Sequence, residues 1–430
     1  MAVTGWTVLL VALGAVPLVV TGDPRVLPAW LLLVVVLVAV DLALAASPRL
    51  VRATRELPGA VRLGESVEAR LRLVHGGRRR LRGVVRDAWE PSAGATATRR
   101  RVSLRPGGGV VLSTVLVPFR RGVRRADSVT IRSLGPLRLA ARQASLALPG
   151  DLTVLPRFSS RRHLPSRLAR LRELDGRTSV QVRGQGTEFD SLREYVRGDD
   201  VRSLDWRATA RRGDLVVRTW RPERDRRVVV VVDSGRTSAA RVGDEPRLDT
   251  AFEAALLLGA LASRAGDHVD LVVTDRRVRG RVQGASGQAL LSAMVEVMAP
   301  VDPELVETDW SLVPGLVRGV TTQRSLVVLA TPAESPGAVR GLLAALPQLT
   351  RRHLVVVAAV TDPTVDEAAL GRGDSTTVYR AAAAERARLD RARVAAAVRQ
   401  LGADVVTGSP ADLPPALADH YLALKAAGRL

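Results

Sequence analysis

Apolar residues form two long runs at the start of the chain. One run extends from Gly5 to Val20, and the second, from Leu27 to Ala46, is broken only by Asp41. Each run is close to the roughly 20 residues that a helix needs to cross the hydrocarbon core of a membrane. The connecting TGDPRV is a turn-like sequence. The pattern therefore predicts a transmembrane hairpin within residues 1–47, with spans at about 5–21 and 27–46.

Asp41 admits two interpretations. A carboxylate inside a membrane span is typical of a functional site. Asp41 also lies five residues before the end of the second run, which places it within reach of the membrane interface.

Basic residues set the expected orientation of this hairpin. Arg49, Arg52, Arg55 and Arg62 follow the second run, whereas the connecting loop contains only Arg25. The positive-inside rule therefore places the bulk of the chain in the cytoplasm, as a two-span protein of the cell membrane. A secretory signal peptide is the competing interpretation of the first run, but a basic n-region and an A-x-A-like cleavage site are both missing from the sequence.

Between residues 48 and 156 the pattern changes to short alternating runs. These runs are VEARLRLV, RGVVRDAWE, VVLSTVLVPF, SVTIRSL, LRLAAR and LTVLP. Alternation of this kind is typical of strands with one buried face, and the turn signals HGG, RPGGG and LGP separate the runs. We therefore predict a small antiparallel β-sandwich, which is also strongly basic.

Residues 228–430 carry near-continuous apolar runs instead. The runs are RRVVVVVD, HVDLVVTD, SLVVLAT, HLVVVAAV and ADVV, and helical stretches separate most of them. Strands that are buried on both faces have this pattern. RVRGRVQ, after Asp275, is typical of an added edge strand. The sequence thus predicts a doubly wound α/β domain with its site at the carboxyl ends of the strands.

The net charge of +21 belongs to the middle of the chain. Residues 47–150 contain 22 arginines and six acidic residues, residues 151–227 carry +7, and the two flanking segments carry −1 each. A basic domain close to a membrane is attracted to anionic lipids, so we expect the membrane surface as its partner. Trp89 and Phe119 are the aromatic residues of this segment, too few for base stacking, which disfavours nucleic acid. The absence of cysteine excludes disulfides and thiol chemistry.

Residues 157–227, between the two predicted domains, are expected to be a linker with an unusual motif at residues 184–227. This motif resembles the signature of the domain of unknown function 58 family, bacterial membrane proteins with a von Willebrand factor A-like domain. The resemblance extends over nearly the whole chain, because the apolar hairpin, the β-rich domain and the VVVVVD strand follow in the family's order. The matching residues are Gly186, Glu188, Phe189, Leu192, Arg193, Tyr195, Gly198, Asp199, Asp200, Arg202, Asp205, Trp206, Ala210, Arg211, Leu215, Val217 and Arg218.

The residues of the motif indicate a short helix held by apolar and charged contacts. Gly198 and Asp199 predict a turn, and Asp200 is the expected N-cap of the helix VRSLDWRATA. Phe189, Leu192, Tyr195 and Trp206 are expected as buried anchors. The surrounding charges permit two interpretations: an ion-pair network that fixes the motif to the α/β domain, or a recognition surface for a partner protein.

The resemblance also implies a metal-ion-dependent adhesion site at the end of the VVVVVD strand. The family of folds carries Asp-x-Ser-x-Ser in the first loop, followed by a threonine and an aspartate in later loops. Here the loop starts with Asp233 and ends with Thr237, Gly235 replaces one hydroxyl, and Thr308 is the candidate threonine. Thr331 follows the strand that would supply the last aspartate. We therefore expect weak or absent Mg²⁺ binding, and no other cofactor.

These observations favour a membrane-anchored, non-enzymatic adaptor protein. The resemblance implies a MoxR-type AAA ATPase as the partner and a role in the assembly or maturation of membrane or envelope complexes. The alternative is a metal-dependent enzyme or a Mg²⁺-gated adhesion domain that uses the loops around Asp233, Thr237 and Thr308.

Overall fold

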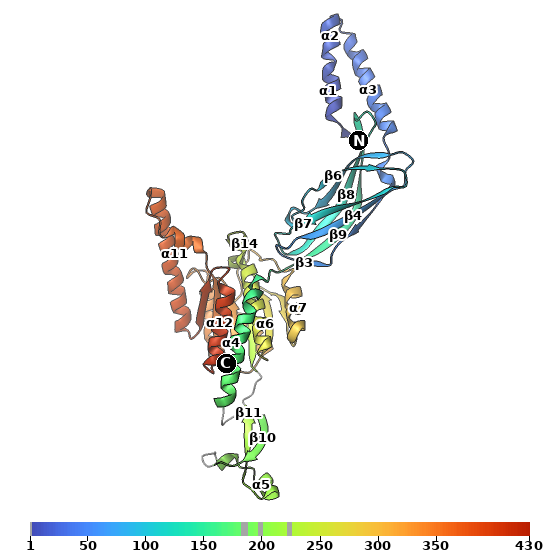
Figure 1. Cartoon of the computed structure of the whole chain (residues 1–430). Coiled ribbons are helices and arrows are strands. Elements are labelled where there is room, and N and C mark those ends of the chain that lie inside the picture. The colour runs from blue at the N-terminus through green and yellow to red at the C-terminus, as the bar shows by residue number, and fades with distance from the viewer. Residues whose placement is uncertain (1, 182–187, 197–200, 222–225) are drawn as a thin grey trace. The chain divides into compact units, whose positions relative to one another are not determined.

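The protein divides into two compact units. The computed structural model describes residues 2–181, 188–196, 201–221 and 226–430 (Figure 1). The first unit is Met1–Leu155 and the second is Pro156–Leu430. Each unit has a hydrophobic core of its own.

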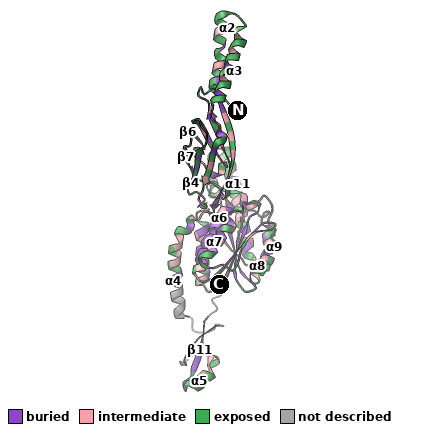
Figure 2. Cartoon of the chain, turned by 90° about the vertical axis from the view of Figure 1, so that its right-hand side faces the viewer, coloured by how far each residue is buried: buried purple, intermediate pink, exposed green. Residues whose placement is uncertain are grey.

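Apolar helices begin the first unit. The elements are β1 (Ala2–Val3), α1 (Gly5–Leu13), α2 (Ala15–Thr21) and α3 (Val26–Leu44). One segment, Val26–Leu50, is long and apolar enough to cross a membrane. Most of α3 is exposed (Figure 2), including Leu32 and Val35, so its surface requires an apolar environment.

The first apolar run is divided at Gly14 and packs against α3. The indole Nε1 of Trp30, on α3, donates a hydrogen bond to the carbonyl oxygen of Leu10 at 2.9 Å. A Cβ atom on Gly14 would lie 2.4 Å from Trp30 Cδ1. The absence of a side chain at Gly14 therefore lets the two helical segments approach closely.

Two β-sheets form the remainder of the first unit. One sheet has the order β1-β9-β8-β5-β6, with β3 beside β9, and the other has the order β2-β4-β7. The strands are β2 (Val51–Glu56), β3 (Ala60–Arg62), β4 (Val67–His75), β5 (Leu81–Trp89), β6 (Arg99–Leu104), β7 (Gly109–Leu116), β8 (Gly122–Leu134) and β9 (Ala140–Leu155).

Buried side chains from both sheets share one core, as in a β-sandwich. Leu73 of the smaller sheet and Leu81 and Ile131 of the larger sheet are fully buried in it. The pairs are antiparallel except for β3 with β9. Two predicted strands, LRLAAR and LTVLP, are parts of the single strand β9, and β2, β3 and β6 were not predicted.

Asp41 fastens α3 to the turn between β8 and β9. The side chain is fully buried, and its Oδ1 accepts a hydrogen bond from the backbone N–H of Leu137 at 2.7 Å. Its Oδ2 accepts from the N–H groups of Leu139 and Ala140, each at 2.8 Å. Three donors compensate for the removal of a charge from water. The carboxylate is therefore a structural clamp near the C-terminal end of α3.

The second unit begins with a helix and a β-hairpin. Helix α4 (Leu164–Gln181) lies in the segment that was predicted to be a linker. It packs on the α/β domain, because Leu171 is buried and Arg167 pairs with Asp419 at 2.6 Å. The hairpin consists of β10 (Glu188–Glu194) and β11 (Val216–Arg221), with α5 (Trp206–Arg212) between them.

A six-stranded sheet is the centre of the second unit. Its order is β16-β15-β12-β17-β18-β19, and β16 is antiparallel whereas the other strands are parallel. RVRGRVQ forms the edge strand, as predicted, and the five apolar runs form the other strands. The bounds are β12 (Arg227–Asp233), β15 (His268–Thr274), β16 (Val278–Val282), β17 (Leu326–Ala330), β18 (Leu354–Val360) and β19 (Asp404–Gly408). A small ladder joins β13 (Arg241–Val242) and β14 (Glu245–Pro246).

Helices cover both faces of this sheet. On one face α8, α9 and α11 share a core with the strands, and on the other α6 and α12 pack together with α4 and α7 around them. Helix α6 is buried over most of its circumference because helices as well as strands surround it (Figure 2). The helices are α6 (Arg247–Arg264), α7 (Gly287–Met298), α8 (Val313–Val320), α9 (Arg340–Thr350), α10 (Pro363–Ala368), α11 (Ser375–Gln400) and α12 (Leu413–Ala426).

The clamp at Asp41 generates a stability prediction. The Asp41→Asn variant removes the charge and turns an N–H₂ group toward backbone donors, so we expect a loss of about 2 kcal/mol of unfolding free energy. The measurement is thermal unfolding of the full chain in detergent. Asp23→Asn is the matched control, because Asp23 is exposed and accepts from the N–H of Arg25 within its own loop. Equal melting temperatures for the two variants would contradict the clamp.

Candidate functional site

The carboxyl end of β12 lies at the point where the order of the sheet reverses. The chain runs from β12 to β15 on one side, and the later strand β17 pairs with β12 on the other side. Ligands of open α/β sheets bind outside the strand ends at such a switch point. Asp233 is the last residue of β12 and is buried there.

Four donors converge on the Asp233 carboxylate. Oδ1 accepts a hydrogen bond from the N–H of Gly235 at 2.8 Å and another from the hydroxyl of Thr308. Oδ2 accepts from the hydroxyl of Thr331 at 2.7 Å and, more weakly, from that of Thr237 at 3.4 Å. The structure thus brings together the three predicted residues Asp233, Thr237 and Thr308. It adds Thr331, which follows the strand that was expected to supply the last aspartate.

Gly235 leaves the space that the Thr308 hydroxyl occupies. A Cβ atom on Gly235 would lie 2.3 Å from Thr308 Oγ1, 2.9 Å from the carbonyl oxygen of Val306 and 3.1 Å from Asp233 Oδ1. A side chain at residue 235 would therefore force the second loop to move. Glycine in place of the serine of the Asp-x-Ser-x-Ser pattern therefore allows the Thr308 hydroxyl to lie where it does.

The charges around this carboxylate are already paired. Arg236, in the loop that follows β12, forms an ion pair with Glu307. Asp275, at the end of β15, accepts from the hydroxyl of Ser234 at 3.1 Å and from Arg279 at 3.0 Å. Neither Glu307 nor Asp275 is therefore a free anionic ligand beside Asp233.

These donors do not make a magnesium site of the usual kind. Mg²⁺ takes near-octahedral oxygen ligands, with carboxylates or waters among them, whereas the three hydroxyls here direct their protons to Asp233. The hollow beside Asp233 and Thr331 has a volume of about 10 Å³, room for about one water. In the described ranges, no group of three His, Asp or Glu side chains is placed to hold a metal.

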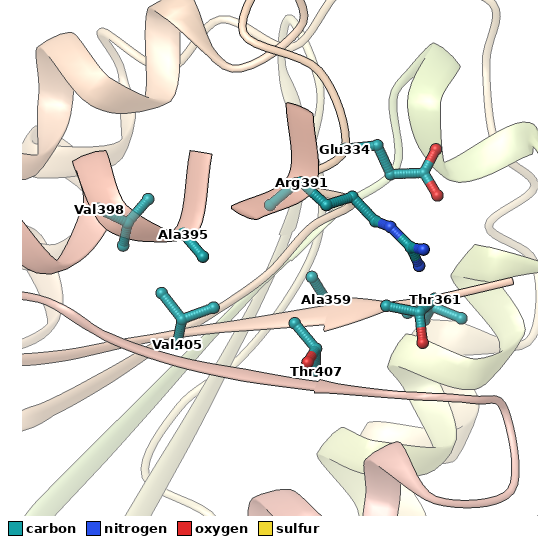
Figure 3. A pocket seen from close by; sticks show the side chains of 10 residues that line it. Glu334, Ala359, Thr361, Arg391, Ala395, Val398, Val405 and Thr407 are labelled. Atoms are coloured by element: carbon teal, nitrogen blue, oxygen red, sulfur yellow. The ribbon is translucent and has the colours of Figure 1, made fainter. Parts of the chain in front are cut away.

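A second hollow lies at the ends of β18 and β19 beneath α11. Figure 3 shows the side chain of Arg391 extending across it toward Thr361, with Glu334 nearby. Its volume is about 20 Å³, far below the several hundred Å³ of small-molecule pockets. Glu334 binds Arg247 through two hydrogen bonds, and Arg391 binds Asp366. These charges are used in internal contacts.

Asp205 organises the signature motif. It is the N-cap of α5, because its Oδ1 accepts from the N–H groups of Arg207 and Ala208, each at 3.0 Å. Its Oδ2 binds Arg218 Nε at 2.7 Å. The Ala208 N–H and the Arg218 guanidinium hold the pKa of this carboxyl below its ordinary value. The helix therefore begins at Trp206, not after Asp200 as predicted.

The other predicted motif residues have different outcomes. Gly186, Gly198, Asp199 and Asp200 lie outside the described residues. Glu188 and Phe189 lie on β10 and Arg202 on a 3-10 turn, without described side chains. Leu192, Arg193 and Tyr195 are half-buried, and Arg211 is exposed on α5.

Trp206 corrects the prediction of a buried anchor. Its side chain is 69% exposed at the first turn of α5. Val196, Val201 and Leu215 are exposed in the same motif. We call these four residues the apolar surface of the motif. Sequence hydrophobicity alone predicts burial for such residues, and it gave no signal of this exposure.

Fold and site together define a doubly wound α/β domain, preceded by a β-hairpin motif and joined to a β-rich unit with apolar helices. The model of the family described as Protein of unknown function DUF58 matches residues 191–403. This match confirms the resemblance recognised in the motif.

Two mycobacterial relatives are named as uncharacterized proteins. The uncharacterized proteins Mb1516 of Mycobacterium bovis and Rv1480 of Mycobacterium tuberculosis are each 27% identical to the chain over 240 residues, which covers 54% of this chain and 75% of theirs.

Two solved structures resemble a quarter of the chain. The CARDB domain of the PF1109 protein from Pyrococcus furiosus covers 24% of this chain and 86% of its own, with 17% identity and a TM-score of 0.19. PapD-like domain 7 of human CEP192 covers 24% and 84%, with 11% identity and a TM-score of 0.18. Likenesses at these scores carry no functional inference.

The donor set around Asp233 predicts the response to magnesium. At about 10 mM Mg²⁺ we expect an unchanged melting temperature, because a cation held only by the native state would raise it. In the Thr331→Asp variant, two adjacent carboxylates repel each other. This variant should melt lower without Mg²⁺ and recover part of the loss with it. A rise for the natural chain, measured by differential scanning fluorimetry, would restore the metal-dependent alternative.

Asp205 predicts a pH dependence confined to the motif. Because its folded pKa is lowered, its stabilising contribution is present above the unfolded pKa and is lost as the pH falls through the folded pKa. We expect the protection of Trp206–Arg212 amides against hydrogen exchange to persist down to the ordinary aspartate pKa, about 4, and to fall as the pH is lowered further. In Asp205→Ala the protection should already be lost at neutral pH, whereas Asp205→Asn, which keeps the cap acceptor, should be intermediate. Identical protection factors in all three proteins would exclude this role.

Proposed function

We propose that this protein is a membrane-anchored, non-enzymatic adaptor whose signature motif docks a partner protein. The single observation that carries the proposal is the apolar surface of the motif. Trp206 is 69% exposed and Val201 66%, although they lie within a segment that the family model matches. Tryptophan is typical of the energetic centre of protein–protein interfaces, and several exposed apolar residues in one motif are typical of an interaction site.

Charges around this surface favour a partner with an acidic rim. Arg207 and Arg211 are exposed on α5, and Arg218 is exposed on β11. Asp205 pairs with Arg218 within the motif. Arg207 and Arg211 are the proposed partners of acidic groups across an interface. Rim charges of this kind increase the association rate and select the partner.

The membrane part of the proposal has two spans. Helix α3 meets the length criterion by itself, and the α1–α2 segment packs against it through Trp30 and Gly14. Exposed apolar side chains along both segments, such as Val19 and Leu32, support lipid as their surrounding. The arginines after α3 support a cytoplasmic location for the remaining chain.

The α/β domain is proposed to be of the von Willebrand A type. Its strand order, with an antiparallel edge strand β16 and an aspartate at the end of the central strand β12, supports this assignment. Asp233 already accepts from four donors, so neither metal binding nor general base catalysis has a free carboxylate there. The domain then serves as a scaffold for protein interaction.

The partner is proposed from the family resemblance to be a MoxR-type AAA ATPase. In this arrangement the membrane anchor holds the ATPase close to the membrane or envelope complexes whose assembly or maturation it assists. The chemistry of the apolar surface requires a complementary apolar pocket with an acidic rim on that ATPase.

A pull-down from native membranes tests the docking surface. We expect Trp206→Ala to reduce recovery of the partner about tenfold or more, because hot-spot tryptophans contribute at least about 2 kcal/mol to binding. Tyr379→Ala is the matched control, since Tyr379 is 79% exposed on α11, outside the motif. Mass spectrometry identifies the recovered protein. Equal recovery with both variants would reject the apolar surface as the docking site, and recovery of a protein other than an AAA ATPase would reject the named partner.

A further inference from the structure

Charge is segregated along the length of the β-sandwich. Four segments meet at the end from which α3 extends: residues 47–52, 75–82, 103–109 and 133–142. In sequence they contain nine arginines and neither aspartate nor glutamate. The acidic residues of 47–155 belong to the other half of the sandwich, for example Glu56 at the end of β2 and Glu90 after β5.

Hydrogen bonds hold these segments at the base of α3. The N–H of Gly76 donates to the carbonyl oxygen of Leu50 at 2.9 Å, and Arg79 Nη1 donates to that of Ala43 at 2.7 Å. His75 joins the 103–109 turn, because its N–H donates to the carbonyl of Gly108 at 2.9 Å. The 133–142 turn is the one that Asp41 clamps.

Six exposed arginines of these segments lie outside the strands, in the turns at this end of the sandwich. We call them the arginine collar. Its members, all exposed, are Arg49, Arg78, Arg79, Arg80, Arg105 and Arg138.

We propose that the arginine collar binds the headgroups of anionic phospholipids at the membrane surface. The inference rests on the proposed function insofar as α3 crosses a membrane. The collar then lies at the depth of the lipid phosphates, since Arg79 bonds to Ala43 one residue before the end of α3. Trp6, 62% exposed on the first turn of α1, marks the same depth, because Thr4 beside it bonds to the carbonyl of Arg138.

Phosphate is the ligand class that this chemistry recognises. Guanidinium groups bind phosphate oxygens through paired hydrogen bonds and remain charged at every physiological pH. The Asp41 carboxylate at this end is fully buried and accepts from three backbone N–H groups. The exposed collar arginines therefore attract anionic lipids, each contributing about 1 kcal/mol before screening. The proposed lipid site is thus confined to one end of the sandwich and does not extend over the whole basic domain.

The chain offers a matched pair of variants. Arg78→Gln/Arg80→Gln removes two collar charges and keeps Arg79, which bonds to a backbone carbonyl. Arg99→Gln/Arg101→Gln removes two exposed charges from β6 and keeps Arg100, which bonds to the carbonyl of Ser113. Net charge and the number of substitutions are identical in the two proteins.

Native mass spectrometry of the detergent-solubilised full chain measures the preference for phosphatidylglycerol over phosphatidylcholine. We expect the collar variant to lose about fivefold or more of this preference, and the β6 variant to keep it. An equal loss in both variants would show that net charge alone determines the lipid preference, and it would overturn the proposal that the collar is the binding site. The proposal would also be overturned if the natural chain showed no preference for phosphatidylglycerol. Complete displacement of the lipid by inorganic phosphate would overturn it as well, because it would indicate a site for free phosphate.

A separate measurement tests the anchoring on which the collar rests. Alkaline carbonate extraction of native membranes should leave the chain in the pellet. Release into the supernatant would reject the membrane spans, while lipid binding by the collar would still be decided by the variants above.

Discussion

The Asp41 carboxylate accepts hydrogen bonds from three backbone N–H groups. These hydrogen bonds join an apolar helix to a polar β-sandwich. Covalent connection through Ala45–Ser47 alone would leave the angle between α3 and the sheets undefined. The clamp, together with the hydrogen bonds from Thr4 to Arg138 and from Arg79 to Ala43, fixes it. The positions of the arginines at that end of the sandwich relative to α3 follow from this constraint, and so does any contact they make with lipid.

Aspartates serve as acceptors of several donors throughout the molecule. Asp41 closes a turn, Asp205 begins a helix and Asp233 gathers the loops at the end of β12. In each case backbone N–H groups or hydroxyls, more than cations, satisfy the carboxylate. Asp41 and Asp233, the two buried members of this group, are therefore satisfied by hydroxyls and N–H groups, whereas Asp205 also pairs with Arg218. A large share of the arginines remains at the surface, where they can act on partners and membranes.

The periodicity of apolar residues predicted the strands of the six-stranded sheet, because burial on both faces leaves a local pattern. In the β-sandwich it predicted β4, β5, β7, β8 and β9 but missed β2, β3 and β6. The site was predicted in part: Asp233, Thr237 and Thr308 were placed together by the fold implied by the resemblance. Thr331 was missed, although its position at the end of the strand next to β12 was a usable signal. The contact of Asp41 with residues almost 100 positions later, the exposure of Trp206 and the choice of Asp205 over Asp200 as cap depend on tertiary packing, which no local pattern encodes.

Gly235 and Thr308 compete for one volume at the end of β12, since a Cβ on the first would overlap the hydroxyl of the second. The two positions therefore cannot vary independently. A relative that carries serine at the position of Gly235 must have a smaller residue or a displaced loop at the position of Thr308. Covariation between these positions would divide such proteins into two groups, one with a closed, hydroxyl-filled strand end and one with an open strand end able to admit a ligand.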